Sequence, residues 1–123
     1  MTIDESTATE AAVVAAVLDY FDGWFDGDAT RMERALHPDL AKRALEPDGR
    51  SLGETTAVWM VDATGRGVGR ERDPGDRQID VTVEDIHATI ASATVRSAVY
   101  REYVHLARTA DGWKIVNTLW APS

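Results

Sequence analysis

The sequence predicts a single α+β domain in which helices come first and antiparallel strands follow. Apolar residues recur with a helical period from Ala8 to Asp26 and again in residues 54–63, whereas apolar and polar residues alternate from Ile79 onward. A chain of 123 residues can form one hydrophobic core and is too short for two. We therefore expect helices packed against one face of a bent, mostly antiparallel sheet.

The first predicted element is a long helix over residues 8–26 with a wide apolar face. Two adjoining stripes make up this face: Val13, Val17, Tyr20 and Trp24 on one, and Val14, Leu18, Phe21 and Phe25 on the other. Gly27 should end the helix, and Asp28 should cap a short second helix that ends before His37-Pro38, because a residue before proline disfavours helical backbone. Residues 1–7 are mostly polar, and we expect a disordered tail there, ahead of a domain over residues 8–123.

The remaining elements follow from turn residues and alternation. Short strands are expected at residues 40–45 and 50–52, joined by the turn sequence Glu46-Pro47-Asp48-Gly49. A third helix is predicted over residues 54–63, followed by a glycine-rich polar loop. Alternating and β-branched residues then predict four strands, over residues 79–86, 88–97, 99–109 and 113–120.

Composition excludes several functions. Thirteen basic and twenty-one acidic residues give a formal net charge of −8, which repels a phosphate backbone, so we expect no nucleic-acid partner. No apolar run is long enough to span a bilayer, and the acidic start MTIDESTATE is unlike a secretory signal. The absence of cysteine excludes disulfides and thiolate chemistry. We expect a cytoplasmic protein that does not bind membranes.

Two segments carry a resemblance to a known superfamily. YFDGWFDGDATRMERALHPDLAKR near the start and HLARTADGWKIVNTLW near the end, with the order of elements, resemble the nuclear transport factor 2-like superfamily. Within it, the chain is most similar to the branch called putative lumazine-binding, a neighbour of the SnoaL-like polyketide cyclases. The resemblance implies a cone of cystatin-like fold: three N-terminal helices packed on a strongly curved sheet, around an apolar pocket open at one end, usually in a homodimer.

Enzymes of this superfamily place one or two acid-base groups inside the cone, where burial shifts their pKa values. His37, where the second helix meets the first strand, is a candidate base; alternatively, its imidazole bonds to the backbone and closes the helix end. Arg43 in the first strand is a candidate anchor for an anionic group of a ligand, or an ordinary exposed arginine. Tyr20 and Trp24, four residues apart on the first helix, either line the pocket or belong to the core.

The last two strands and the third helix supply the other candidates. In residues 99–109, Arg101, Tyr103 and His105 share one face. If that face is the inner one, Tyr103 and His105 form a catalytic proton-transfer pair; if it is the outer one, they belong to a dimer interface or a hydrated surface. Trp59 and Asn117 are further candidate ligand contacts. The three histidines lack metal-ligand spacing, so we expect no metal and no cofactor.

Two functions follow from these residues. The first is a small-molecule-binding protein with an apolar pocket and an undetermined reaction. The second is a cofactor-independent acid-base enzyme, an isomerase, cyclase or lyase, acting on a small aromatic or carbonyl-bearing substrate. In that enzyme, His37 or His105 would act as base, and Tyr20 or Tyr103 would donate to a developing oxyanion. We favour binding; convergence of two of these four side chains inside the cone would favour the enzyme.

Overall fold

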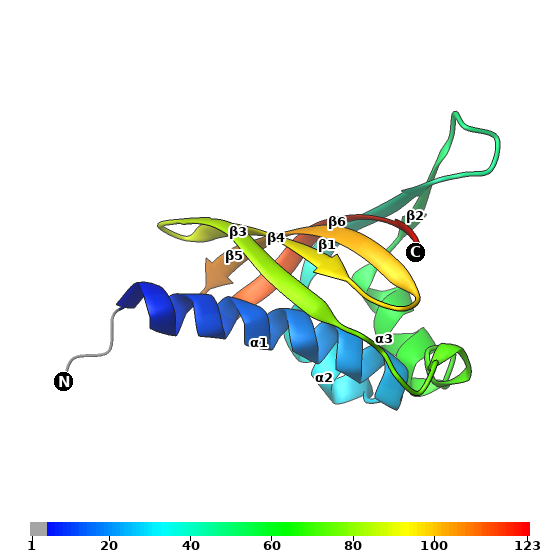
Figure 1. Cartoon of the computed structure of the whole chain (residues 1–123), viewed down its shortest axis with the longest axis horizontal. Coiled ribbons are helices and arrows are strands. Elements are labelled where there is room, and N and C mark those ends of the chain that lie inside the picture. Colours follow the sequence, from blue (N-terminus) through cyan, green and yellow to red (C-terminus); the bar gives the residue numbers. More distant parts are fainter. Residues whose placement is uncertain (1–4) are drawn as a thin grey trace.

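A computed structural model describes residues 5–123 and contains three helices and one six-stranded sheet. The helices are α1 (Glu5–Asp26), α2 (Ala29–Ala35) and α3 (Ala57–Gly65), with a short 3-10 turn, η1 (Arg70–Arg72). The strands are β1 (Leu36–Leu45), β2 (Leu52–Thr55), β3 (Asp80–His87), β4 (Ile90–Arg96), β5 (Tyr100–Thr109) and β6 (Gly112–Pro122). The predicted α+β architecture, with its helices near the N-terminus, is confirmed (Figure 1).

The sheet is curved and mostly antiparallel. Its strand order is β2-β1-β6-β5-β4-β3, and β1 and β6 form the parallel pair. Three neighbouring pairs shift register along their length, β1 with β6, β3 with β4, and β5 with β6. Such irregularities bend strands and increase their twist, so they account for the curvature that makes room for a cavity. In Figure 1, α1 lies lengthwise along one face of the sheet, with α2 and α3 gathered near its C-terminal end.

The apolar face of α1 builds the core against the sheet. The stripe predicted from the sequence is buried throughout, at Val13, Val17, Tyr20 and Trp24, and Phe21 and Phe25 of the neighbouring stripe are buried with it. Opposite them lie the inward residues of β4, β5 and β6, among them Val95, Val104 and Ile115. Burial of these side chains away from water is the main term that holds helix and sheet together.

The start of α1 differs from the prediction, and its end agrees with it. The helix begins at Glu5, so residues 5–7, expected in the tail, are helical, while residues 1–4 lie outside the described part. Gly27 follows the helix with a φ of 70°, a conformation that glycine adopts without strain. The Asp28 side chain then accepts a hydrogen bond from the Arg31 N–H, so the predicted cap of α2 is confirmed.

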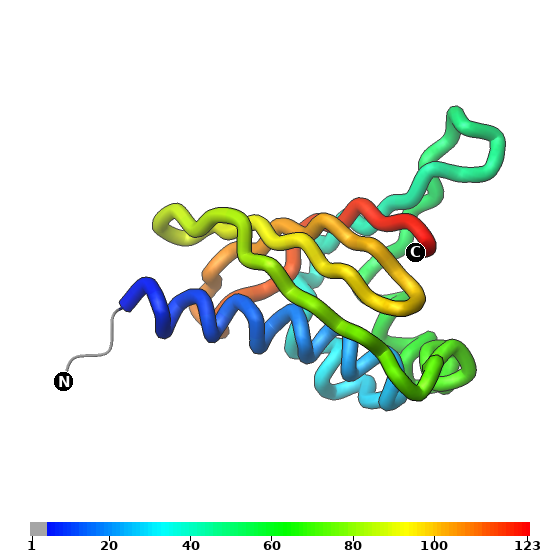
Figure 2. The backbone as a smooth tube through the Cα atoms, viewed as in Figure 1, coloured from blue at the N-terminus to red at the C-terminus, as the bar shows by residue number. Residues whose placement is uncertain are grey.

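The segment after α2 corrects two predicted boundaries. β1 begins at Leu36, so His37 and Pro38 lie within the strand and not before it. The register of β1 with β6 shifts between Leu36 and Ala41, so the proline lies outside the regular hydrogen-bond ladder. β2 extends to Thr55, so α3 starts later than expected, where the Thr56 side chain accepts from the Trp59 N–H. Figure 2 shows the β1–β2 hairpin projecting away from the rest of the molecule.

Residues 66–77 close one end of the cone. Arg77 forms ion pairs with Asp22 and Asp26 of α1, at 2.9 and 2.7 Å, and with Asp73. Gly69 packs so closely on Trp24 that an added Cβ would lie 2.6 Å from the indole Cδ2. The segment is therefore held against the end of α1.

Candidate ligand-binding pocket

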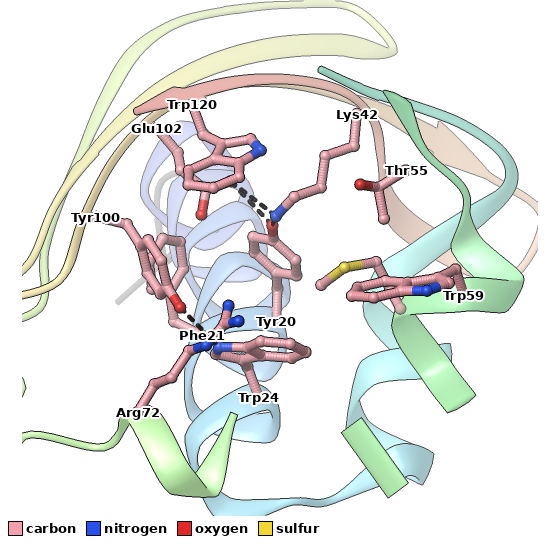
Figure 3. Close-up of a pocket in the computed structure, with 11 residues that line it drawn as sticks. Tyr20, Phe21, Trp24, Lys42, Thr55, Trp59, Arg72, Tyr100, Glu102 and Trp120 are labelled. Atoms are coloured by element: carbon pink, nitrogen blue, oxygen red, sulfur yellow. Dashed lines mark hydrogen bonds and ion pairs between the residues drawn. The ribbon is translucent and has the colours of Figure 1, made fainter. Parts of the chain in front are cut away.

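A pocket opens between the end of α1, α3, η1 and the inner face of the sheet (Figure 3). Its walls are mainly aromatic, and the space among them, including open space at its mouth, is about 490 Å³. Six rings line it: Tyr20, Phe21, Trp24, Trp59, Tyr100 and Trp120. Met60, Thr55 and three charged residues, Lys42, Arg72 and Glu102, complete the wall.

Lys42 and Glu102 form a buried ion pair inside this aromatic pocket. The Lys42 Nζ lies 3.6 Å from the Glu102 Oε1, and their side chains are only 10% and 3% exposed. Glu102 also accepts hydrogen bonds from the Tyr20 hydroxyl, at 2.9 Å, and from the Thr118 hydroxyl, at 2.8 Å. The Lys42 ammonium donates to the Tyr20 oxygen, so the three side chains form one connected polar group.

Strand register brings these residues together. Lys42 is paired with Thr118 across β1 and β6, and Glu102 is paired with Trp120 across β5 and β6. Because side chains alternate between the two faces of a strand, all four point to the concave face. Tyr20 meets them from α1, one helical turn before Trp24. In Figure 3 the Lys42 amine points toward the Tyr20 hydroxyl, with Trp120 and Tyr100 on one side and Trp59 on the other.

Burial shifts the ionisation of the pocket groups. Desolvation raises the pKa of the Tyr20 hydroxyl well above its usual value, and the neighbouring Glu102 carboxylate raises it further. Desolvation also lowers the pKa of Lys42, while the charge of Glu102 opposes that change. Two of the pocket rings also lie beside the ammonium, those of Tyr20 at 4.9 Å and Trp120 at 5.3 Å from Nζ to ring centroid. Tyr20 is thus neutral, and Lys42 loses a proton more easily than an exposed lysine.

Three residues predicted as ligand contacts do line this pocket. Tyr20 is 2% and Trp24 6% exposed, so each is both a core and a lining residue. The Trp24 Nε1 donates to the Tyr100 hydroxyl at 3.2 Å, which fixes the plane of the indole. Trp59 is 46% exposed at the mouth of the pocket.

The structure places Tyr103, His105 and Asn117 on the other face of the sheet. Glu102, Val104 and Leu106 of β5 are buried, so the residues between them point outward by the alternation of a strand. His105 is exposed, and its Nδ1 lies 3.3 Å from the Asn117 side-chain nitrogen. Of the two orientations considered for Tyr103 and His105, the structure therefore has the outer one, so they do not form a proton-transfer pair inside the cone.

His37 and Arg43 also lie away from the pocket. The His37 Nδ1 accepts a hydrogen bond from the Asp39 N–H at 3.0 Å, which matches the structural alternative considered for this residue. Arg43 follows Lys42 and therefore points to the opposite face of β1, where its Nε lies 3.7 Å from the Glu54 Oε1. Of the four proton-transfer candidates Tyr20, His37, Tyr103 and His105, only Tyr20 lines the pocket.

Lys42 and Glu102 were not among the site residues predicted from the sequence, although the sequence contains a sign of each. Lys42 follows Leu40 by two positions and so shares its inward face. Glu102 stands among Tyr100, Val104 and Leu106, the apolar side of β5. A charge at an apolar position of a strand is the pattern that indicates a buried polar site.

Within residues 5–123, no group of three or more histidine, aspartate or glutamate side chains is placed to hold a metal ion. Over the same residues, no helix combines the length and the apolar character needed to cross a membrane.

Comparison with known proteins identifies the family. Residues 8–121 match the family described as "Putative lumazine-binding", so the chain belongs to that family. Sequence comparison with functionally curated proteins gives no match. The fold is shared with solved structures described as nuclear transport factor 2-like, which confirms the predicted fold.

Three of these solved structures illustrate the likeness. A protein of unknown function from Silicibacter pomeroyi is 15% identical, with a TM-score of 0.74 and 100% of both chains covered. Another of unknown function, from Shewanella baltica, is 16% identical, with a TM-score of 0.75 and coverage of 99% of this chain and 98% of that one. A protein with a cystatin-like fold from Novosphingobium aromaticivorans is 16% identical, with a TM-score of 0.69 and coverage of 95% and 83%.

The ion pair yields a prediction about stability. Lys42→Met and Glu102→Gln should each lower the free energy of unfolding by about 3 kcal/mol, because each leaves a buried charge unpaired. The double variant should lose less than the sum of the two, by a coupling of up to about 3 kcal/mol. Urea unfolding of the four proteins measures this coupling, and additive losses would show that the two charges do not depend on each other.

Proposed function

We propose that this protein binds a small, planar aromatic or heteroaromatic molecule in the pocket, with Lys42 and Glu102 as its polar contacts. The observation that carries the proposal is the buried ion pair within a wall of aromatic rings. Ligand sites typically combine an apolar lining with a few placed polar groups, and this pocket has both.

Stability alone does not account for the ion pair. Moving two charges out of water often costs more free energy than their mutual attraction returns. Replacing such a pair by apolar residues of similar volume is therefore often neutral or stabilising. Lys42 and Glu102 both face the cavity as well as each other. A ligand that accepts a hydrogen bond from the amine or donates one to the carboxylate would give these two groups a role in binding.

The aromatic wall favours a flat ligand. Indole and phenol rings attract other π systems in offset or edge-to-face geometry, at about 0.5–1.5 kcal/mol per pair beyond the area they bury. The family carries the description "Putative lumazine-binding". Lumazine is a planar heterocycle with carbonyl acceptors and N–H donors, the functional groups that this ion pair can recognise. It is therefore the first probe to use.

A second candidate is the cofactor-independent acid-base enzyme, an isomerase, cyclase or lyase of the SnoaL-like kind. The observation that favours it is the contact of three proton-transfer groups, Tyr20, Lys42 and Glu102, at one point of the pocket. In this form of the proposal, Lys42 or Glu102 takes the part first considered for His37 and His105, and Tyr20 donates to the oxyanion. A carbonyl-bearing aromatic molecule could be the ligand of the binding protein or the substrate of the enzyme.

The binding proposal is tested by calorimetric titration with lumazine. Trp59→Ala should weaken binding by roughly tenfold, or 1.4 kcal/mol, because it removes a ring from the pocket mouth. Its melting temperature should change little, since Trp59 is 46% exposed. Val58→Ala is the matched control: Val58 precedes Trp59 on α3 and is 79% exposed, so binding should be unchanged.

Two results would contradict the binding proposal. One is an equal effect of the Trp59 and Val58 variants, which would place the ligand elsewhere. The other is a failure of lumazine and of a panel of pterins, flavins, purines and aromatic polyketides to bind or to raise the melting temperature.

We also propose a homodimer formed through the outer face of the sheet. Four large apolar side chains are exposed on this part of the molecule: Leu45 at 61%, Leu52 at 51%, Tyr103 at 51% and Leu119 at 48%. Leu119 is paired with Tyr103 in the sheet, and both line a hollow that also contains Leu45 and the charged Arg101 and Glu46. A second copy offers the same mixed surface in return. A cytoplasmic location fits a chain without cysteine.

The dimer is tested by sedimentation equilibrium. Leu119→Glu should shift the protein to a monomer, because two like charges would meet across the two-fold axis, whereas Val58→Glu on α3 should leave the dimer intact. A wild-type protein that stays monomeric at all micromolar concentrations would contradict the proposal.

A further inference from the structure

Lysine is scarce in this chain. Lys42 and Lys114 are its two lysines, against eleven arginines, so nearly every surface cation is an arginine. Arginine also forms stronger, bidentate pairs with carboxylates, which makes it the usual partner for a buried glutamate. The buried cation of the pocket is nevertheless a lysine. A primary amine has one capacity that a guanidinium lacks, which is to act as a nucleophile toward a carbonyl carbon.

We propose that Lys42 is a nucleophilic amine that forms an imine with an aldehyde or ketone ligand held in the aromatic pocket. The inference rests on the proposed small-molecule site and specifies its ligand class. Lys42 is the amine that lines the cavity, and its Nζ lies among aromatic rings that would hold the carbonyl compound next to it. The side chain is 10% exposed, so a bound carbonyl would be largely shielded from water.

The neighbours of Lys42 suit the proton transfers that imine formation requires. Glu102, 3.6 Å from Nζ, can take a proton from the ammonium and leave a neutral amine. The nitrogen lone pair then forms a bond to the carbonyl carbon as the C–O π bond breaks, and the resulting alkoxide is protonated. Tyr20, which contacts both residues, is placed to donate to this oxygen.

The second half of the reaction releases water. After the attack the nitrogen carries two protons, and it gives one of them back to the Tyr20 oxygen, which restores the neutral phenol. Glu102 then returns its proton to the hydroxyl, the C–O bond breaks and water leaves, while the nitrogen lone pair forms the C=N bond. Overall, one lysine ammonium and one carbonyl give one protonated imine and one water, and no oxidant, reductant or cofactor is consumed. Hydrolysis is the reverse of these steps, so the adduct is reversible.

Lys114 provides an internal comparison. Its Nζ donates to the Arg34 carbonyl oxygen at 2.6 Å, on the outside of the fold near α2. Within residues 5–123, its ammonium has neither the carboxylate partner nor the neighbouring aromatic rings of Lys42. Selective reaction at one lysine of this chain therefore reports the pocket environment directly.

The test is trapping with an aldehyde and cyanoborohydride, which reduces an imine to a stable secondary amine. Benzaldehyde and 2-naphthaldehyde are used separately at neutral pH, and labelled residues are located by chymotryptic digestion and mass spectrometry. Lys42 should be labelled faster than Lys114 by at least about tenfold, or 1.4 kcal/mol of activation free energy. Lys42→Arg should abolish the rapid label, and Lys114→Arg should retain it.

Unfolding supplies a control that needs no variant. In urea, Lys42 and Lys114 of the wild-type protein should react at similar rates, because the pocket no longer exists. Labelling of Lys114 and the N-terminus with Lys42 unmodified in the folded protein, by both aldehydes, would overturn the inference. Calorimetry with 2-naphthol, which cannot form an imine, then shows whether the proposed pocket fails together with the imine. If 2-naphthol binds and Trp59→Ala weakens its binding, only the imine proposal is wrong. If 2-naphthol does not bind, the pocket proposal is contradicted as well.

Discussion

The buried ion pair of Lys42 and Glu102 is the interaction on which the concave side of this molecule depends. It links β1 to β5 across β6, and through Tyr20 it links the sheet to α1. A charged pair in such surroundings persists only if each partner stays satisfied, so Tyr20 and Thr118 must hold their places as donors. As a result, the interior of the cone contains the polar side chains of Lys42, Glu102 and Tyr20, which face an aromatic cavity.

Segment 66–77 closes the end of the cone next to that cavity. Arg77, with its ion pairs to α1, holds the segment in place, and Gly69 lets it approach Trp24 without a Cβ. Arg72 is brought to the pocket wall, where its guanidinium carbon lies 6.0 Å from the Trp24 ring centroid. The pocket is thus bounded by the sheet, α1 and α3, and on its remaining side by segment 66–77, which is held to α1 by ion pairs. That arrangement positions polar groups before a ligand arrives, which lowers the entropic cost of binding.

Sequence patterns predicted the layers of this fold better than they predicted the residues of the pocket. The helical stripe of α1, its end at Gly27, the cap at Asp28 and the late strands follow from local propensities that act over a few residues. Which face of β5 points inward depends on how β5 pairs with β4 and β6, a non-local fact. The sequence therefore left open whether Tyr103 and His105 face the pocket, and Glu102, the residue before Tyr103, was overlooked.

The most direct test of the account is whether the Lys42 side chain senses a bound ligand. With lysine labelled by ¹³C and ¹⁵N, the two lysines give two sets of side-chain signals, so Lys42 and Lys114 are observed separately by NMR. On titration with lumazine, the account predicts a saturable shift of the Lys42 signals and none for Lys114. Saturable binding that leaves the Lys42 signals unmoved would contradict it, because the ion pair would then be only a structural feature of the core.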